Sequence, residues 1–261
     1  MDLGLQGKTA LVLGGGGGLG KAIAQTLGRE GARVAVAGRT KTTLDQTVQE
    51  IEKAGSQGLA LPWDISDLTA IEENVAAVEK RFGTVNVLIN NTGGPPPTPA
   101  SGQDPALWNR SFQAMVLSVI AITDRVLPGM RERHWGRIIT SASSGVVAPI
   151  PNLALSNALR LSLVGWSKTL AREVARDGIT ANIVLPGRIA TDRVRSLDEA
   201  RARREGRSVE EVENESRSSI PLGRYGEPQE YAEVIAFLAS VQSSYITGSI
   251  IRVDGGAIAS I

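Results

Sequence analysis

Short apolar runs alternate along the chain with longer stretches in which apolar residues recur every three or four positions. Seven of these runs predict buried β-strands, at residues 9–13, 33–37, 58–61, 85–89, 137–140, 179–185 and 249–253. Helical spacing is clear at Leu19, Ile23 and Leu27, and again between Leu155 and Val174. Because strands alternate with helices, the pattern predicts an α/β fold of the doubly wound Rossmann type, a parallel sheet of about seven strands with helices on both faces.

No linker divides the chain, so we expect one NAD(P)-binding domain over residues 1–261. Residues 188–219 interrupt the alternation with charged sequence and predict a helical insertion. Insertions at this point of doubly wound folds lie at the carboxyl ends of the strands, which places this one on the substrate side. Its arginines are balanced by acidic residues over its length, which favours a solvated helix over an anion-binding lid.

Composition excludes several classes of protein. The 28 Lys and Arg and 27 Asp and Glu give a net charge of +1, without the basic excess that nucleic acid requires. The chain has no cysteine and one histidine, which excludes disulfides, thiolate chemistry and a His-rich or Cys-rich metal centre. The first apolar run is too short for a signal peptide or a membrane span. We therefore expect a cytoplasmic protein without a metal, nucleic-acid or membrane partner.

A run of five glycines follows the first predicted strand and opens the first predicted helix. Such a loop lets the backbone approach a pyrophosphate, and the helix N-terminus offers unpaired N–H groups. The motif has two spellings here, because Gly15, Gly17 and Gly20 fit GxGxxG whereas Gly14, Gly18 and Gly20 fit GxxxGxG. Both spellings predict a dinucleotide site, and the alternative is a flexible turn without a ligand.

The end of the second predicted strand favours NADP over NAD. An acid in this position would bind the ribose 2′-hydroxyl of NAD. The chain instead has Gly38, Arg39 and Thr40 there. A guanidinium is planar and permanently charged, which suits a 2′-phosphate. NADP is therefore the expected cofactor, with NAD as the alternative and a solvated Arg39 as the remaining interpretation.

Further motifs follow the later strands in order. They are Asn90-Asn91-Thr92-Gly93, Pro186-Gly187-Arg188-Ile189-Ala190-Thr191 and Val253-Asp254-Gly255-Gly256. Over nearly the whole chain this order resembles the short-chain dehydrogenase/reductase family. A second set is similar to the 3-oxoacyl-acyl-carrier-protein reductases within that family, namely Pro221-Leu222-Gly223-Arg224 and Thr247-Gly248.

The resemblance implies where a nicotinamide cofactor binds. The glycines would cradle the pyrophosphate and Asp64 would meet the adenine. Asn91 and Gly93 would line the adenosine side, and Ile189 with Thr191 would hold the nicotinamide carboxamide. The plainer alternative is that these motifs only cap turns and end strands. The implied cofactor set is Gly14, Gly18, Leu19, Gly20, Arg39, Thr40, Asp64, Ile65, Asn91, Gly93, Arg160, Pro186, Gly187, Ile189 and Thr191.

The catalytic positions depart from the family pattern, which has an Asn, a Ser and a YxxxK pair 13 residues after the Ser. Ser143 fits the Ser position, but Ser156 and Arg160 stand in place of the Tyr and the Lys. Met115 stands at the Asn position. No shift of register restores the tyrosine, because the chain's tyrosines are Tyr225, Tyr231 and Tyr245. The candidate catalytic residues are therefore Ser143, Ser156 and Arg160.

The missing tyrosine leaves two hypotheses for function. General acid–base catalysis accelerates reactions by about 100- to 10,000-fold, so its loss would slow a ketone reductase severely. Arg160 keeps a positive charge on the helical face of Ser156, but it cannot shuttle a proton as a lysine can. The first hypothesis is an NADP-dependent oxidoreductase that acts on a small carbonyl or alcohol substrate with a non-standard proton donor. The second is a catalytically impaired dinucleotide-binding sensor or partner subunit, and the intact nicotinamide-facing motif favours the first.

The resemblance also implies self-association. The helices around residues 108–130 and 155–174 carry apolar stripes that would be buried between subunits of a homotetramer or homodimer.

Overall fold

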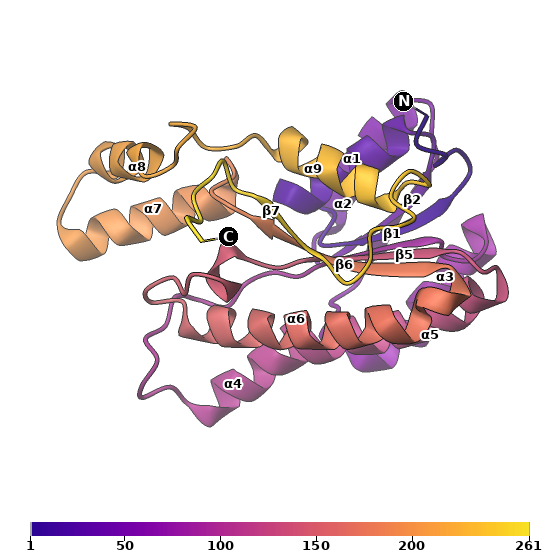
Figure 1. Ribbon diagram of the computed structural model, residues 1–261, viewed down its shortest axis with the longest axis horizontal. Helices are drawn as coiled ribbons and strands as arrows, with labels where there is room; N and C mark the ends of the chain where they lie inside the picture. The colour runs from indigo at the N-terminus through magenta and orange to yellow at the C-terminus, as the bar shows by residue number, and fades with distance from the viewer. Residues whose placement is uncertain (1, 261) are drawn as a thin grey trace.

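The seven predicted strands all form, and they lie in one parallel sheet (Figure 1). The computed structural model describes residues 2–260. Its strands are β1 (Thr9–Leu13), β2 (Arg33–Gly38), β3 (Gly58–Pro62), β4 (Val87–Asn91), β5 (Gly136–Ser141), β6 (Ile179–Pro186) and β7 (Ile250–Val253). Their order is β3-β2-β1-β4-β5-β6-β7, which reverses direction between β1 and β4 and creates a crevice at the carboxyl ends of these two strands. The predicted fold class is confirmed.

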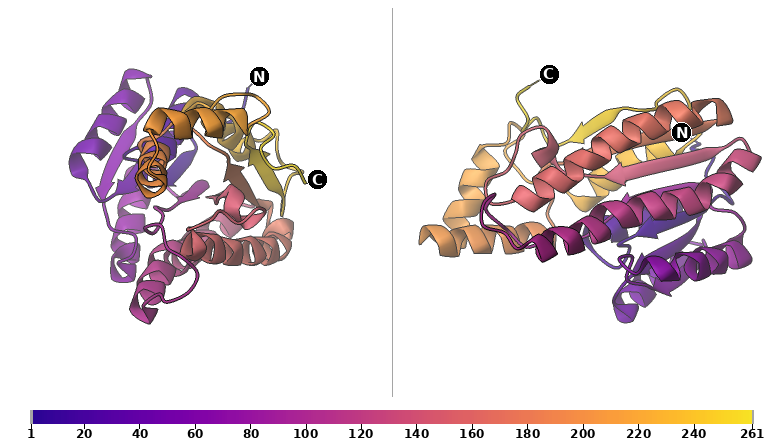
Figure 2. Two further views of the ribbon diagram at one scale, coloured as in Figure 1. Left: turned by 90° about the vertical axis from the view of Figure 1, so that its left-hand side faces the viewer. Right: turned by 90° about the horizontal axis from the view of Figure 1, so that it is seen from below.

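Helices cover both faces of the sheet (Figure 1, Figure 2). One face carries α1 (Gly18–Arg29), α2 (Lys41–Lys53) and α9 (Pro228–Ala239), and the other carries α3 (Ile71–Phe82), α5 (Ser118–Glu132) and α6 (Ala154–Val174). Alternate side chains of a strand point to opposite faces. In β1, Ala10 and Val12 therefore join the first core cluster, whereas Leu11 and Leu13 join the second. Burial on both faces explains why these strands read as continuous apolar runs.

One strand is displaced from its predicted position. The apolar run predicted a strand at 85–89, but β4 is Val87–Asn91. Val85 is fully buried ahead of the strand, so apolarity alone gave too early a start. Asn90 and Asn91 consequently lie within the strand, in register with Thr140 and Ser141 of β5, and do not form the loop that was expected to follow it.

The long helical segment Pro105–Glu132 consists of α4 (Pro105–Phe112), a π-helical turn (Gln113–Leu117) and α5. By length and composition it would suit a membrane span, a test that buried helices of soluble proteins also meet. Part of its apolar surface packs against α6. The cluster that they share contains Met115, Val116, Val119, Leu155, Leu159 and Leu163.

The insertion forms two helices, α7 (Asp192–Glu205) and α8 (Val209–Ser218), which project beyond the carboxyl ends of the strands (Figure 1). Gly206 ends α7 in a left-handed conformation, and Ser208 with Glu211 forms a capping box at the start of α8. Arg201 and Arg207 both form ion pairs with Glu215, so the two helices are also joined by charge.

Candidate functional site

The glycine-rich loop between β1 and α1 cannot accept side chains at Gly14, Gly18 and Gly20 without strain or a clash. Gly14 and Gly18 have positive φ angles of 65° and 50°. A Cβ atom on Gly20 would lie 2.1 Å from the Gly14 carbonyl oxygen. Gly17, in contrast, has extended backbone and open space around it. The loop therefore requires glycine at the GxxxGxG positions, and it presents the N-terminus of α1 as a cradle for phosphates.

Asn91 supports this loop from the neighbouring strand. Its Nδ2 donates to the Leu13 carbonyl oxygen over 3.2 Å and would lie 2.9 Å from a Cβ on Gly20. The side chain therefore fastens the end of β4 to the end of β1. Gly93 lies two residues further on and is exposed at the mouth of the crevice. Leu19 is half-buried and packs against the first core cluster.

The ends of β2 and β3 form the other wall of the crevice. Arg39 is exposed directly after β2, and Thr40 is the N-cap residue of α2. Asp64 accepts hydrogen bonds from the Ser66 backbone N–H and hydroxyl over 3.0 and 2.8 Å. These bonds lower the pKa of Asp64, and the positive charge of Arg39 acts in the same direction. Ile65 is half-buried against the second core cluster.

The loop after β6 is held by its backbone. Gly187 donates to the Val253 carbonyl oxygen over 2.9 Å, and a Cβ there would lie 2.6 Å from the Asp254 Cα. The Pro-Gly motif and the Val-Asp-Gly-Gly motif are thus two sides of one contact, in which Pro186 pairs with Val253. On either side of Ile189, the Ala190 N–H and the Arg188 carbonyl bond to Gly226. Ile189 is consequently fixed, with its side chain buried.

Thr191 brings this loop to the glycine-rich loop. Its hydroxyl accepts from the Val194 N–H over 3.3 Å and caps α7, and it contacts the Ile189 carbonyl over 3.3 Å. The Thr191 methyl group would lie 3.7 Å from a Cβ on Gly18. The two loops implied to bind opposite halves of a dinucleotide therefore meet at one edge of the sheet.

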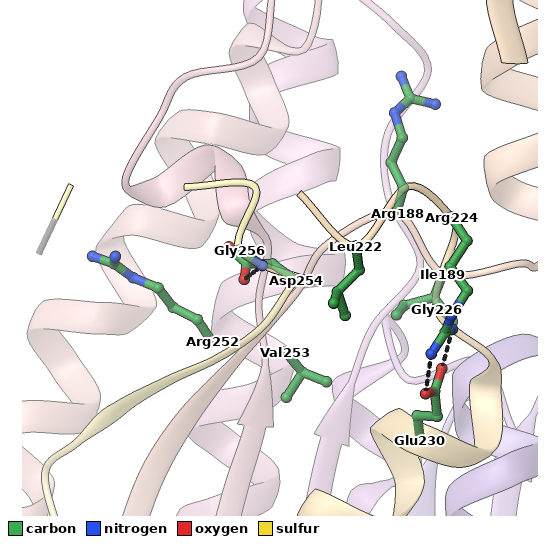
Figure 3. Close-up of a pocket in the computed structure, with 11 residues that line it drawn as sticks. Arg188, Ile189, Leu222, Arg224, Gly226, Glu230, Arg252, Val253, Asp254 and Gly256 are labelled. Carbon is green, nitrogen blue, oxygen red and sulfur yellow. Dashed lines mark hydrogen bonds and ion pairs between the residues drawn. The ribbon is translucent and has the colours of Figure 1, made fainter. Parts of the chain in front are cut away.

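Two cavities flank the loop after β6. One, of 280 Å³, lies between the N-termini of α1 and α7 and is lined by residues that include Gly18, Lys21 and Thr191. The other, of 510 Å³, lies on the far side of the loop, where Arg224 and Glu230 form an ion pair of 2.7 Å (Figure 3). Only the first cavity adjoins the glycine-rich loop, so it is the one that suits cofactor phosphates.

The predicted catalytic residues lie on two adjoining elements. Ser143 caps the short helix Ser144–Val146, and its Oγ accepts from the Gly145 N–H over 3.1 Å. Ser156 is in the first turn of α6 and is 8% exposed. Arg160 follows one turn later on the same face. The short helix packs against α6, so the structure brings these positions to the carboxyl end of β5.

Arg160 is buried and forms three hydrogen bonds to backbone carbonyls. It donates to the oxygens of Ser141, Thr92 and Gly93, each over 3.2 Å. Burial lowers its pKa to about 10, and the charge of Arg193 adds to that effect. The guanidinium therefore joins the ends of β4 and β5. The sequence predicted a catalytic and cofactor-binding Arg160, and its role in holding these strand ends was missed.

Tyr231, which no sequence pattern placed here, lies beside Ser141, one of the residues that Arg160 binds. It is fully buried on α9, and its hydroxyl lies 2.8 Å from the Ser141 Oγ and 3.3 Å from the Val184 carbonyl oxygen. Burial raises the pKa of Tyr231. Because the Tyr231 phenol is fully buried between α9 and the sheet, it cannot reach a substrate and does not replace the missing proton donor. Its only sequence signal is a hydroxyl on an otherwise apolar helix face.

Met115 replaces the polar side chain expected from the family pattern with an apolar one. It is buried in the cluster shared with Leu155 and Leu159 of α6, which flank Ser156. The wall next to the catalytic positions is therefore hydrophobic.

Comparisons with known proteins agree with this geometry. Residues 15–257 match the family model described as enoyl-(acyl carrier protein) reductase. The chain is 37% identical over 254 residues to the 3-oxoacyl-acyl-carrier-protein reductase FabG of Escherichia coli K12, with 96% of this chain and 97% of that protein covered.

Solved structures show the same architecture. The L-sorbose reductase of Gluconobacter frateurii, complexed with NADPH and L-sorbose, superimposes with a TM-score of 0.94 at 29% identity over 100% of both chains. An actinorhodin polyketide ketoreductase with NADPH has a TM-score of 0.92 at 35% identity and covers 96% of this chain and 97% of its own. The chain belongs to the short-chain dehydrogenase/reductase family and is an oxidoreductase.

Proposed function

We propose that this oxidoreductase uses NADPH to transfer hydride between the nicotinamide and a small carbonyl or alcohol substrate, with a proton donor other than tyrosine. One observation carries the proposal: the loop after β6 lies against the glycine-rich loop, so that the Thr191 methyl group would be 3.7 Å from a Cβ atom added to Gly18. A complete dinucleotide site requires these two loops side by side. A protein that bound only adenine and phosphates would have no use for the second loop. The NADPH complexes of the two reductases named above support this choice of cofactor.

The residues present fit NADPH. Gly14, Gly18 and Gly20 form a cradle that any Cβ would fill or strain, so the phosphates would lie against their backbone. Arg39 would hold the 2′-phosphate, because it is exposed and no acid stands at the end of β2. Asp64 and Ile65 would flank the adenine, and Ile189 with Thr191 the nicotinamide. Bound NADPH supplies the hydride.

The chain's own residues would supply the proton and stabilise the substrate oxygen, without the Tyr and Lys of the family pattern. Ser143 and Ser156 offer hydroxyls at the carboxyl end of β5, directly or through water. Arg160 remains protonated at neutral pH, since its pKa of about 10 lies well above 7. Its fixed charge stabilises negative charge that develops on a substrate oxygen in this buried setting. Substrates that need little help from a proton donor suit such a site best.

The alternative, a dinucleotide-binding sensor or partner subunit, also has specific support. The Arg160 guanidinium is engaged by carbonyls, Met115 is apolar and Tyr231 is sealed off. The two functions are separated by single-turnover mixing of the protein with NADPH and a panel of carbonyl compounds. Loss of NADPH absorbance supports the enzyme, whereas tight NADPH binding without oxidation on any substrate supports the sensor.

Arg39→Ala should weaken NADPH binding about tenfold and leave NADH binding unchanged, because a charged hydrogen bond to a phosphate is lost. Fluorescence titration of both cofactors measures this. Arg176→Ala is the control, since Arg176 is exposed and precedes β6 at the opposite end of the sheet. Equal losses for both cofactors would show that Arg39 does not select the 2′-phosphate.

We infer that the protein forms a homotetramer or homodimer. Most of the exposed large apolar side chains lie in two separate regions, with Phe112, Leu117 and Leu161 on the helices α4 to α6 and Phe237, Val241, Tyr245 and Ile250 around α9 and β7. β7 is also an edge strand, whose free backbone groups invite pairing with a second copy.

At micromolar concentration, light scattering should therefore give the mass of a dimer or tetramer. Leu161→Arg and Ile250→Arg should each reduce the assembly, because a charge would enter an apolar contact. A monomeric mass for the unmodified protein contradicts the inference.

We treat the chain as one NAD(P)-binding domain whose residues 188–219 form an insertion on the substrate side, and we expect it in the cytoplasm. The relatives named above act on different carbonyl compounds, so they support a carbonyl or alcohol class rather than one compound.

A further inference from the structure

Asp198 is a fully buried carboxylate in the middle of the highly charged helix α7. It is 0% exposed, and it is the only buried acid among the residues that the structure describes. Burying a carboxylate is costly unless charged or hydrogen-bonding partners surround it. The burial of Asp198 on a projecting helix must therefore be compensated by its partners.

Both carboxylate oxygens of Asp198 are occupied. Oδ1 accepts from the Arg188 guanidinium in an ion pair, and Oδ2 accepts from the Tyr225 hydroxyl over 2.7 Å. The Tyr225 ring in turn lies beneath two guanidinium groups, those of Arg188 at 5.8 Å and Arg217 at 5.5 Å. Burial and the bond to Asp198 raise the pKa of the Tyr225 hydroxyl, so it remains a donor at neutral pH. Arg188, Asp198 and Tyr225 thus form one closed cluster.

This cluster holds the residue next to Ile189. Arg188 and Ile189 both line the neighbouring cavity (Figure 3). Ile189 is directed to Gly226, where its Cδ1 would lie 2.7 Å from an added Cβ. The backbone here is bonded to Gly226 through the Arg188 carbonyl and the Ala190 N–H, over 2.9 and 2.8 Å. Asp198 contacts the same loop through the Arg188 side chain.

We propose that Asp198 is a positioning residue for the nicotinamide half of the cofactor. Through Arg188 it sets the backbone of Ile189 and Thr191, and it couples their position to α7. This inference rests on the proposed NADPH site. The glycine-rich loop and Arg39 lie outside the cluster, so the adenosine half should bind independently of Asp198.

The test compares the whole cofactor with its adenosine half, using NADPH and adenosine 2′,5′-bisphosphate as probes in fluorescence or calorimetric titrations. Asp198→Asn keeps the shape and the bond from Tyr225 but removes the ion pair. It should weaken NADPH binding about tenfold and change adenosine 2′,5′-bisphosphate binding less than about twofold. Glu199→Gln, on the adjacent position of α7, is the matched control and should change neither.

Three results would overturn the inference. They are an unchanged NADPH affinity in Asp198→Asn, an equal loss for both probes, and an equal effect of Glu199→Gln. Tyr225→Phe is the milder variant if Asp198→Asn fails to fold. It retains the ion pair, and it should show a smaller loss with the same selectivity for NADPH. A wild-type protein that binds neither probe would instead contradict the proposed function. If the wild type binds both probes and the Asp198 and Tyr225 variants bind them equally well, this inference alone is contradicted.

Discussion

Replacing Arg160 by methionine should lower the free energy of unfolding by about 2–6 kcal/mol. Two effects oppose each other. Burial lowers the pKa of the guanidinium to about 10, which corresponds to a desolvation cost of about 3 kcal/mol that the variant would relieve. Against this, three hydrogen bonds from a charged donor are lost, each worth about 1.5–3 kcal/mol. The hydrogen bonds outweigh the desolvation, so Arg160 stabilises the fold.

Urea denaturation measures the expected loss, and limited proteolysis should show faster cleavage between residues 92 and 99, because the Thr92 and Gly93 carbonyls lose their partner. Arg160→Lys should give a smaller loss, since an ammonium lacks the planar fork that reaches several carbonyls. Arg172→Met is the control, because Arg172 is an exposed arginine on the same helix. A variant within about 0.5 kcal/mol of the wild type would mean that Arg160 carries no structural role.

The strands of the sheet could be predicted from the sequence, whereas the contacts of Arg160 could not. Each strand of a buried parallel sheet is apolar on both faces, so its position is written in contiguous residues. The boundary of β4 was wrong because Val85 is buried in the loop before it, and burial in a loop has the same apolar signature as burial in a strand. Element positions were therefore predictable to within about two residues, as local patterns allow.

The glycine motif was predictable in place, and the family resemblance implied Gly14, Gly18 and Gly20, although the residues alone fit two spellings. The structure explains that choice, because Gly14 and Gly18 have positive φ angles, Gly20 contacts Gly14, and Gly17 of the other spelling lies in open space. These angles depend on how β1, β4 and α1 meet, which no local pattern records.

Asp198 shows why the rest of the site was out of reach. In the sequence it is one of many balanced charges in a polar insertion, where a solvated helix is the ordinary interpretation. Its burial depends on Arg188 and Tyr225, which lie 10 positions before it and 27 positions after it. The same holds for the carbonyl partners of Arg160, because their geometry exists only after the sheet has formed.

Restoring the family pair by Ser156→Tyr with Arg160→Lys should raise turnover of simple ketones by NADPH about tenfold or more. General acid–base catalysis contributes about 100- to 10,000-fold, and the cofactor loops are already assembled, so the proton donor is the main missing element. Ser156 shares its helical face with Arg160, which points to the ends of β4 and β5, so a phenol there would enter the crevice. Met115 remains apolar and limits the gain to part of the full range.

Neither single change should recover the activity alone. Ser156→Tyr places a phenol beside a guanidinium that three carbonyls engage, and Arg160→Lys loosens those carbonyls without adding an acid. Steady-state rates of the wild type, both single variants and the double variant form a cycle, in which residues that act as a unit give a non-additive recovery. A double variant no faster than the wild type refutes the idea that the pair is the missing element. A wild type that already turns over such ketones at about 10 per second, the typical enzyme rate, would show instead that Ser143, Ser156 or a bound water passes the proton efficiently and that the altered pair is no defect.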